Sequence, residues 1–442
     1  MTDKNNALIS VPVATAVGLG AIIGAGIFVL SGSAISIAGA DALIAFIIVG
    51  FVAILVALEL GELGAIVPNA QGASYSYVYK AFGSELGFIT GIIFYFSSAT
   101  AISAISLGFG AYLSSLLGVS SGYSIYLAIL LIALISALNL FGVKKAANAD
   151  FVLVIVKLAA LFIFILFALN FAFGMGHLKA SNFSVDATQS GLGPIAAASI
   201  AIFFAYSGFQ TISTLTSKIK GGPNSAAHAI LLSVILSLAV YIAVVIAMLL
   251  IVPASVFKIS SADPISLALS FASAPQILKT IVDIGALVAT ASAALAMILR
   301  SSRIVYQLGN DGLIPKAISK HKPKAEVSAN SVAITALIAI LTLFSGNVYI
   351  IAAISVFGVL FTYLMSSFSL IHFRRIGKSG SFKSPFYPYL PVVAIVFLTA
   401  FLLGMPSQSL SIGVIMIILL LSLYYVLREH DEKKIVRIKL FK

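Results

Sequence analysis

The sequence predicts an all-α integral membrane protein with about twelve transmembrane helices, and three observations carry this prediction. First, 61% of the 442 residues are hydrophobic and only 9% are charged, whereas a soluble domain has about 25% charged residues. Second, apolar runs such as Leu43 to Leu58 and Phe151 to Leu169 recur along the chain. Each approaches or reaches the ~20 residues that a helix needs to cross a bilayer. Third, the sequence lacks the short alternating segments of a transmembrane barrel.

The apolar runs define the expected spans in chain order. The first run is too long for the core of a signal peptide, and we expect it to be retained. No stretch between the runs is long enough for a soluble domain. The expected spans are 8–37, 41–66, 84–117, 122–142, 149–174, 191–216, 225–252, 276–308, 328–345, 348–373, 386–404 and 408–428.

The distribution of Lys and Arg predicts the orientation. An even number of spans puts both termini on one side, and we expect that side to be the cytoplasm, with the chain in the cell membrane. All Lys and Arg then lie in or beside cytoplasmic segments except Lys157, Lys179, Lys258 and Lys279, as the positive-inside rule requires. The net charge of +12 therefore reflects orientation and attraction to anionic lipid headgroups, and no nucleic-acid partner is expected.

Several functional classes lack their signatures. The chain has no cysteine, so disulfides and thiolate chemistry are excluded. The sequence contains no zinc-protease helix, no nucleophile–base motif and no Walker A loop, which argues against an enzyme and against ATP-driven pumping. The histidines form no metal-spaced set. We therefore expect no enzyme activity, no cofactor and no metal.

The first span is unusually rich in glycine. Gly18, Gly20, Gly24 and Gly26 lie in its middle, and the spacing of Gly20 and Gly24 is typical of close helix packing. The alternative is a break at Gly24-Ala25-Gly26, because glycine permits an unwound backbone. Exposed N–H groups and the positive end of the outer half-helix would then favour an anionic group such as a carboxylate. Both interpretations stay open on the sequence.

The sixth span offers a counterpart, with one glycine among aromatic residues in Phe203 to Gln210. Two glycine-interrupted spans in corresponding halves of a membrane protein indicate a transport site near the bilayer midplane. The two candidate breaks are five spans apart, as an inverted repeat of five helices predicts.

Four blocks of residues together resemble the amino acid–polyamine–organocation (APC) superfamily of transporters, most closely its proton-coupled amino-acid branch. They follow one another over roughly 300 residues, and each block alone is only moderately specific. The blocks are Ile23 to Phe28, Glu62 to Ala65 with Pro68 and Gly72 to Tyr77, Phe203 to Ser213 with Pro223, and Ser302-Arg303 with Tyr306 and Asp311 to Pro315.

The resemblance implies a LeuT-like fold with alternating access. Residues 1–373 would form a five-plus-five inverted-repeat core with broken helices 1 and 6, and residues 374–442 would form two C-terminal helices and a basic tail. It also implies an amino-acid pocket between the broken helices, in which backbone groups hold the substrate. The implied residues are the N–H groups of Gly24, Ala25, Gly26 and Ile27 for the carboxylate, and the carbonyls of Ile22, Phe204 and Ser207 for the ammonium. Phe204 would act as a gate, beside Tyr206, Gly208 and Gln210.

The chain departs from many relatives at two positions after the sixth-span glycine. Gln210 and Ser217-Lys218 stand where those relatives carry acidic residues. Without these carboxylates a second cationic group on the substrate lacks a partner, so we expect neutral amino acids as substrates.

Lys157 lies inside the fifth span. A charge at this depth is costly and usually faces an internal cavity, although a lysine can also stretch towards the interface. The resemblance places its ammonium where sodium-coupled relatives bind sodium, near carbonyls of Gly18 or Leu19 and the hydroxyls of Thr290 and Ser292. Because burial disfavours the charged form, this lysine is a candidate for proton coupling.

The remaining intramembrane charges are expected to form ion pairs. Glu59 and Glu62 would pair with basic residues at the inner end of the second span, and Arg300 and Arg303 would pair with acidic ones at the end of the eighth. The leading interpretation is therefore proton symport of amino acids. An obligatory exchanger and a non-transporting receptor on the same fold remain alternatives, and the oligomeric state stays open.

Overall fold

The computed structural model describes residues 9–440 except 69, 71, 73, 142–145, 185–188, 214–215, 217–218, 258–260 and 320–327. The departure noted at Ser217 and Lys218 therefore lies outside the described residues. Within them the chain is helical, with no strand and one isolated bridge between Ile9 and Ile219.

The first half of the chain runs from Ile9 to Gly174 and contains seven α-helices. They are α1 (Val11–Ile22), α2 (Ser31–Ala38), α3 (Ala42–Ile66), α4 (Ser74–Phe82), α5 (Ser84–Leu117), α6 (Ser124–Phe141) and α7 (Ala146–Leu169). Short π- and 3₁₀-segments connect or extend them, namely η1 (Gly26–Leu30), η2 (Gly39–Asp41), η3 (Ser121–Tyr123) and η4 (Asn170–Gly174).

The second half continues the pattern to the C-terminus. Its α-helices are α8 (Leu192–Tyr206), α9 (Gln210–Ser213), α10 (Gly222–Ile251), α11 (Pro264–Phe271), α12 (Gln276–Asn310), α13 (Lys316–Ser319), α14 (Ala329–Thr342), α15 (Val348–Arg375), α16 (Tyr389–Leu403) and α17 (Ser407–Leu440). The 3₁₀-segments are η5 (Ala180–Phe183) and η7 (Ala254–Val256).

The apolar helices lie within or overlap the expected spans along the chain. Within the described residues, eight helical regions are long and apolar enough to cross a membrane, and three shorter apolar helices are α8, α14 and α16. The first of the eight runs from Val11 to Ile66 and contains two of the expected spans, separated by η2. The all-helical membrane fold is thus confirmed, whereas the number of crossings remains a prediction.

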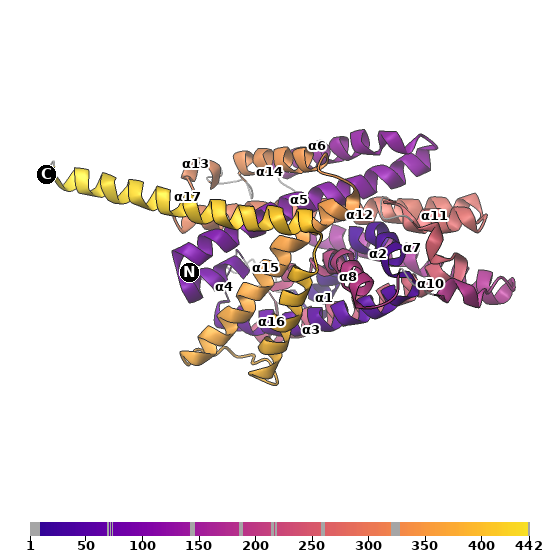
Figure 1. Ribbon diagram of the computed structural model, residues 1–442, viewed down its shortest axis with the longest axis horizontal. Helices are drawn as coiled ribbons and strands as arrows, with labels where there is room; N and C mark the ends of the chain where they lie inside the picture. Colours follow the sequence, from indigo (N-terminus) through magenta and orange to yellow (C-terminus); the bar gives the residue numbers. More distant parts are fainter. Residues whose placement is uncertain are drawn as a thin grey trace.

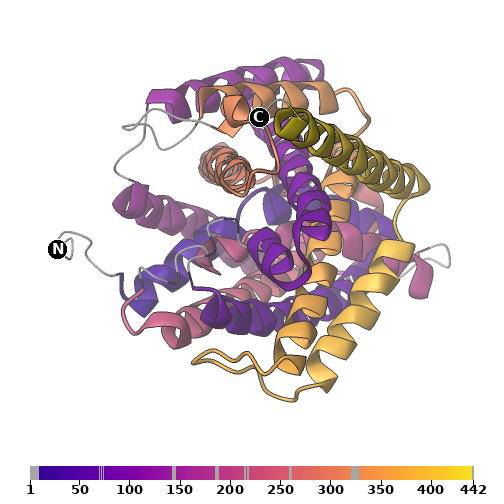
Figure 2. The same ribbon diagram turned by 90° about the vertical axis from the view of Figure 1, so that its left-hand side faces the viewer.

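The helices pack in a bundle around α5 and α12, which contact each other along the centre. Helices α6 and α14 lie along one edge of the bundle, and α15 and α16 lie side by side near the opposite edge (Figures 1 and 2). In its most apolar window α5 is 89% buried. Its small residues permit this burial, because they let neighbouring backbones approach closely. Helices α5 and α15 show this close approach. The hydroxyls of Ser97 and Ser355 each donate to the backbone carbonyl of the other residue, at 2.6 and 2.8 Å.

Three features were not expected from the sequence. Helix α4 and helix α11 are too short to cross a membrane, so an apolar-length criterion misses them. The expected span 408–428 is the first part of a longer helix, because α17 continues through the basic tail to Leu440. Figure 1 shows α17 extending well beyond the rest of the bundle.

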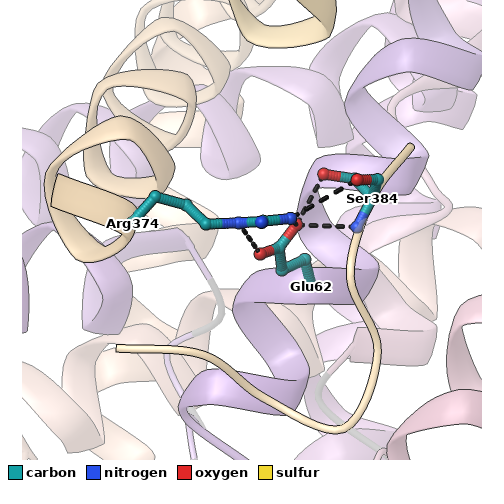
Figure 3. Close-up of polar contacts among 3 residues, drawn as sticks. All are labelled: Glu62, Arg374 and Ser384. Atoms are coloured by element: carbon teal, nitrogen blue, oxygen red, sulfur yellow. Dashed lines mark hydrogen bonds and ion pairs between the residues drawn. The ribbon is translucent and has the colours of Figure 1, made fainter. Parts of the chain in front are cut away.

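A largely buried ion pair joins the C-terminal part of α3 to the end of α15 (Figure 3). Arg374 Nε donates to Glu62 Oε1 at 2.5 Å, and its Nη2 donates to Oε2 at 3.0 Å. The N–H of Ser384 also donates to Glu62 Oε2, at 2.7 Å. The expected pairing of Glu62 is therefore confirmed. For Glu59 the expectation was wrong, because its carboxylate accepts from the Ser367 hydroxyl at 2.5 Å.

Replacement of Glu62 by alanine is expected to lower stability more than any surface charge removal. Glu62 is fully buried, and loss of one partner of a buried pair costs about 3–5 kcal/mol because the other charge stays behind. The apparent melting temperature of the purified protein measures this effect. Glu85→Ala is the control, because the exposed contact of Glu85 with Tyr425 contributes about 0–1 kcal/mol. Equal melting temperatures for the two variants would contradict the expectation.

Candidate functional site

The first expected break is present. Helix α1 ends at Ile22, Ile23 leaves the helical region with φ −75° and ψ 86°, and helical structure resumes before η1 at Gly26. The segment from Gly26 continues through α2 to Ala38. N–H groups in the first turn of a helix have no partner within that helix. The four residues expected to hold the substrate carboxylate, Gly24 to Ile27, thus lie at the start of a helical segment inside the bundle.

The second expected break is also present. Helix α8 ends at Tyr206, a turn spans Ser207 to Phe209, and α9 starts at Gln210. Gln210 is 1% exposed and Phe204 is 5% exposed. Tyr206 is fully buried as well, so both aromatic residues lie inside the protein.

The two breaks fit into each other through their glycines. A Cβ on Gly26 would overlap the backbone of Ala205 in α8, and a Cβ on Gly208 would overlap the carbonyl of Ala21 in α1. Gly24 lies against α12, where an added Cβ would be 3.0 Å from the Cβ of Ala293. The glycines therefore serve close packing and the break at the same time, so the two interpretations of the first span are compatible.

Tyr241 of α10 bridges the two breaks, and the sequence analysis missed it. Its hydroxyl lies 2.8 Å from the Ile22 carbonyl and 3.0 Å from the Ala205 carbonyl, so it can donate to either. Its ring packs edge-on against Tyr206 at 5.2 Å. The available signal was the single tyrosine of the expected span 225–252, which alone does not separate a bridging hydroxyl from an ordinary packing residue.

Tyr241→Phe is expected to destabilise the protein while leaving its packing intact. The change removes only the hydroxyl, and a buried carbonyl that loses its partner costs about 1–3 kcal/mol. Thermal melting of the variant measures the loss. Tyr126→Phe is the matched control, because Tyr126 is 67% exposed. A melting temperature unchanged in both variants would show that the bridge contributes nothing.

The three carbonyls expected to hold the substrate ammonium already accept hydrogen bonds. Ile22 accepts from Tyr241, Phe204 accepts from the N–H of Ser207 at 3.2 Å, and Ser207 accepts from Arg300 Nη1 at 3.0 Å. A carbonyl oxygen has two lone pairs, so a further donor can still bind to each. At Ser207, however, the substrate ammonium would share the carbonyl with the guanidinium of Arg300, which also carries a positive charge.

Arg300 does not form the expected ion pair. Its guanidinium donates to the Ser98 hydroxyl at 3.1 Å and to the Ser207 carbonyl, and it lies over the Phe94 ring at 5.3 Å. No carboxylate among the described residues pairs with it. The sequence placed Arg300 at the cytoplasmic end of its span, whereas the length of α12 leaves it three turns short of that end.

Lys157 is buried, at 2% exposure. Its ammonium donates to the Gly20 carbonyl at 2.8 Å, one residue beyond the Gly18 and Leu19 carbonyls named from the sequence. Two glycines let α7 approach its neighbours this closely. A Cβ on Gly20 would lie 2.5 Å from Val154, and a Cβ on Gly285 of α12 would overlap Ala160.

The expected hydroxyl partners of Lys157 lie on α12. Thr290 donates its proton to the Ala286 carbonyl at 2.7 Å, and Ser292 donates to the Ala289 carbonyl at 3.1 Å. Their protons are used within their own helix, so towards a cation each hydroxyl presents only lone pairs. Helices α1, α7 and α12 meet in this region.

Comparison with known proteins identifies one family. The sequence model described as amino acid permease matches residues 13–428. The methylthioribose transporter of Bacillus subtilis is 26% identical, over 89% of this chain and 87% of that protein. The branched-chain amino acid permease BcaP of Lactococcus lactis is 27% identical, over 95% and 94%. The serine/threonine exchanger SteT of Bacillus subtilis is 25% identical, over 93% and 94%.

Solved structures show the same fold. A variant of the manganese transporter of Eremococcus coleocola superposes with a TM-score of 0.59 at 17% sequence identity. The alignment covers 96% of this chain and 95% of that one. At this identity the likeness concerns the fold alone.

Proposed function

The chain belongs to the amino acid permease family, whose members are membrane transporters and not enzymes, and we propose that it takes up neutral amino acids by proton symport. The substrate binds between the two breaks, with its carboxylate on the N–H groups of Gly24 to Ile27 and its ammonium on carbonyls of α1 and α8. Access alternates between the two sides of the cell membrane, and both termini face the cytoplasm.

The contact of Lys157 with Gly20 carries the proposal of proton coupling. The ammonium binds directly to α1, three residues before the backbone leaves the helix at Ile23, and its helix α7 also contacts α12. A charged group inside a membrane span is costly, and in this proposal the release and uptake of the Lys157 proton is the coupling step. Protonated Lys157 holds α1 against α7, and the neutral amine holds it less strongly, which links protonation to movement of the broken helix.

Two observations support a neutral substrate. Gln210 is a neutral residue at the second break, so it offers no charge to a cationic side chain. Among the relatives, two branched-chain amino acid permeases align over more than nine-tenths of this chain.

Transport into proteoliposomes tests this function. Radiolabelled leucine, isoleucine and valine should accumulate when the outside is more acidic than the inside, and a protonophore should abolish the accumulation. Uptake that requires amino acid inside the vesicles, and ignores the pH gradient, would instead establish an exchanger. That alternative is favoured by the similarity to the serine/threonine exchanger.

The substrate class has its own control. Because a methylthioribose transporter is among the relatives, unlabelled methylthioribose belongs in the same competition assay. Competition by branched-chain amino acids but not by methylthioribose is expected. The reverse pattern would refute the amino-acid assignment.

A further inference from the structure

Arg300 carries a positive charge at the second break that no carboxylate of the described residues neutralises. Its three described partners are the Ser98 hydroxyl, the Ser207 carbonyl and the Phe94 ring. All three are uncharged, so they orient the guanidinium without cancelling its charge.

Among the described residues, the remaining end of the guanidinium has no hydrogen-bond partner. Nη2 of Arg300 is buried and makes no hydrogen bond within the described structure. Charged residues inside membrane spans are costly, and those without an ion pair typically mark a path for a substrate or ion. Arginine also stays protonated at any physiological pH, so this charge is fixed and does not follow the proton.

The hydrogen bond from Arg300 to the Ser207 carbonyl places this charge at the proposed substrate pocket. Ser207 is two residues after Ala205, whose backbone touches the Gly26 position of the first break. The same Ser207 carbonyl is one of the groups assigned to the substrate ammonium. An amino acid bound at this carbonyl would therefore lie close to a cation of the protein.

We propose that Arg300 is a specificity-determining residue that excludes amino acids with cationic side chains, an inference that rests on the proposed function. The α-ammonium of a substrate is offset by its own carboxylate, so the zwitterion carries no net charge into the site. A lysine or arginine substrate adds one uncompensated positive charge. Two such charges about 6 Å apart, at the effective dielectric of a partly exposed site, weaken binding by roughly 100-fold.

The first experiment needs no variant. Norleucine and lysine share the same four-carbon side chain, except that lysine ends in an ammonium. Competition against labelled leucine on the reconstituted wild-type protein should give a lysine affinity at least about tenfold weaker than that of norleucine. Equal affinities would overturn the inference and the restriction to neutral substrates, while leaving amino-acid uptake by proton symport intact. Failure of both ligands and of leucine to bind would refute the proposed function.

Variants then assign the discrimination to Arg300. Arg300→Gln keeps a hydrogen-bond donor but removes the charge, and it should bring lysine to within a few-fold of norleucine. Arg300→Lys keeps the charge and should keep the discrimination. This variant tests the inference even if Arg300→Gln does not fold. Arg375→Gln, at the exposed end of α15, is the matched control and should behave as wild type. Unchanged discrimination in Arg300→Gln, or its loss in a folded Arg300→Lys, would overturn the inference.

Discussion

Replacement of Gly208 by alanine is expected to abolish amino-acid transport. A methyl group at this position would overlap the backbone carbonyl of Ala21, and a backbone atom cannot turn away as a side chain does. The overlap is relieved only by separating α1 from the turn after α8. Overpacking of a protein interior costs about 1–3 kcal/mol, and the separation also moves the groups that would hold the substrate. We expect uptake to fall by at least about tenfold, since ~1.4 kcal/mol corresponds to that factor.

Gly193→Ala is the matched control for this substitution. Gly193 lies in α8, and no atom is within 4 Å of a Cβ placed there. Alanine also has the higher helix propensity, so this variant should transport normally and melt no lower than wild type. Gly26→Ala should reproduce the defect of Gly208→Ala, because its methyl group would overlap Ala205 from the other side. Normal transport by Gly208→Ala would show that the interlocked breaks are not required.

Replacement of Lys157 by glutamine is expected to uncouple transport from the proton gradient. Glutamine can still donate a hydrogen bond to the Gly20 carbonyl, but it does not change its charge between pH 5 and 9. Substrate binding should persist, whereas accumulation driven by an acidic outside should disappear. Binding measured by thermal shift and uptake measured in proteoliposomes separate the two effects.

The control for Lys157 is a lysine of the same chain in a different environment. Lys179 is exposed in the segment before η5, and Lys179→Gln should leave both binding and gradient-driven accumulation unchanged. Accumulation by Lys157→Gln in proportion to the pH gradient would refute a coupling role. Loss of binding as well as accumulation would indicate that the ammonium is needed to hold α1 in place.

Part of the fold could be read from local composition. The expected span 84–117 coincides with α5, and 276–308 differs from α12 only at its end, because long apolar runs and helix length are linked by the thickness of a bilayer. Both breaks were also found at the expected glycines. Helices α4 and α11 were not, since helices of 9 and 8 residues leave no comparable signal in hydropathy.

The polar contacts inside the bundle could not be predicted from local composition. Lys157 was identified as a buried lysine from its position in a span, but the Gly20 carbonyl as its acceptor depends on how closely α7 packs against α1. Tyr241 and Arg300 contact carbonyls that are 36 and 93 residues away in the chain. No spacing rule within one helix connects such residues.

The sequence by itself determined that the chain is a helical membrane protein, that two of its spans carry glycines where a break is possible, and that it resembles a transporter family. These properties depend on apolar length, on glycine and on local motifs, each of which is contained in one stretch of chain. Only the tertiary structure decided that Gly26 and Gly208 interlock, that Tyr241 bridges the breaks, and that Arg300 lies at Ser207 with no acidic partner among the residues that the structure describes. The reason is geometric, because a backbone carbonyl looks the same at every position in the sequence and gains a role only when packing brings a donor to it.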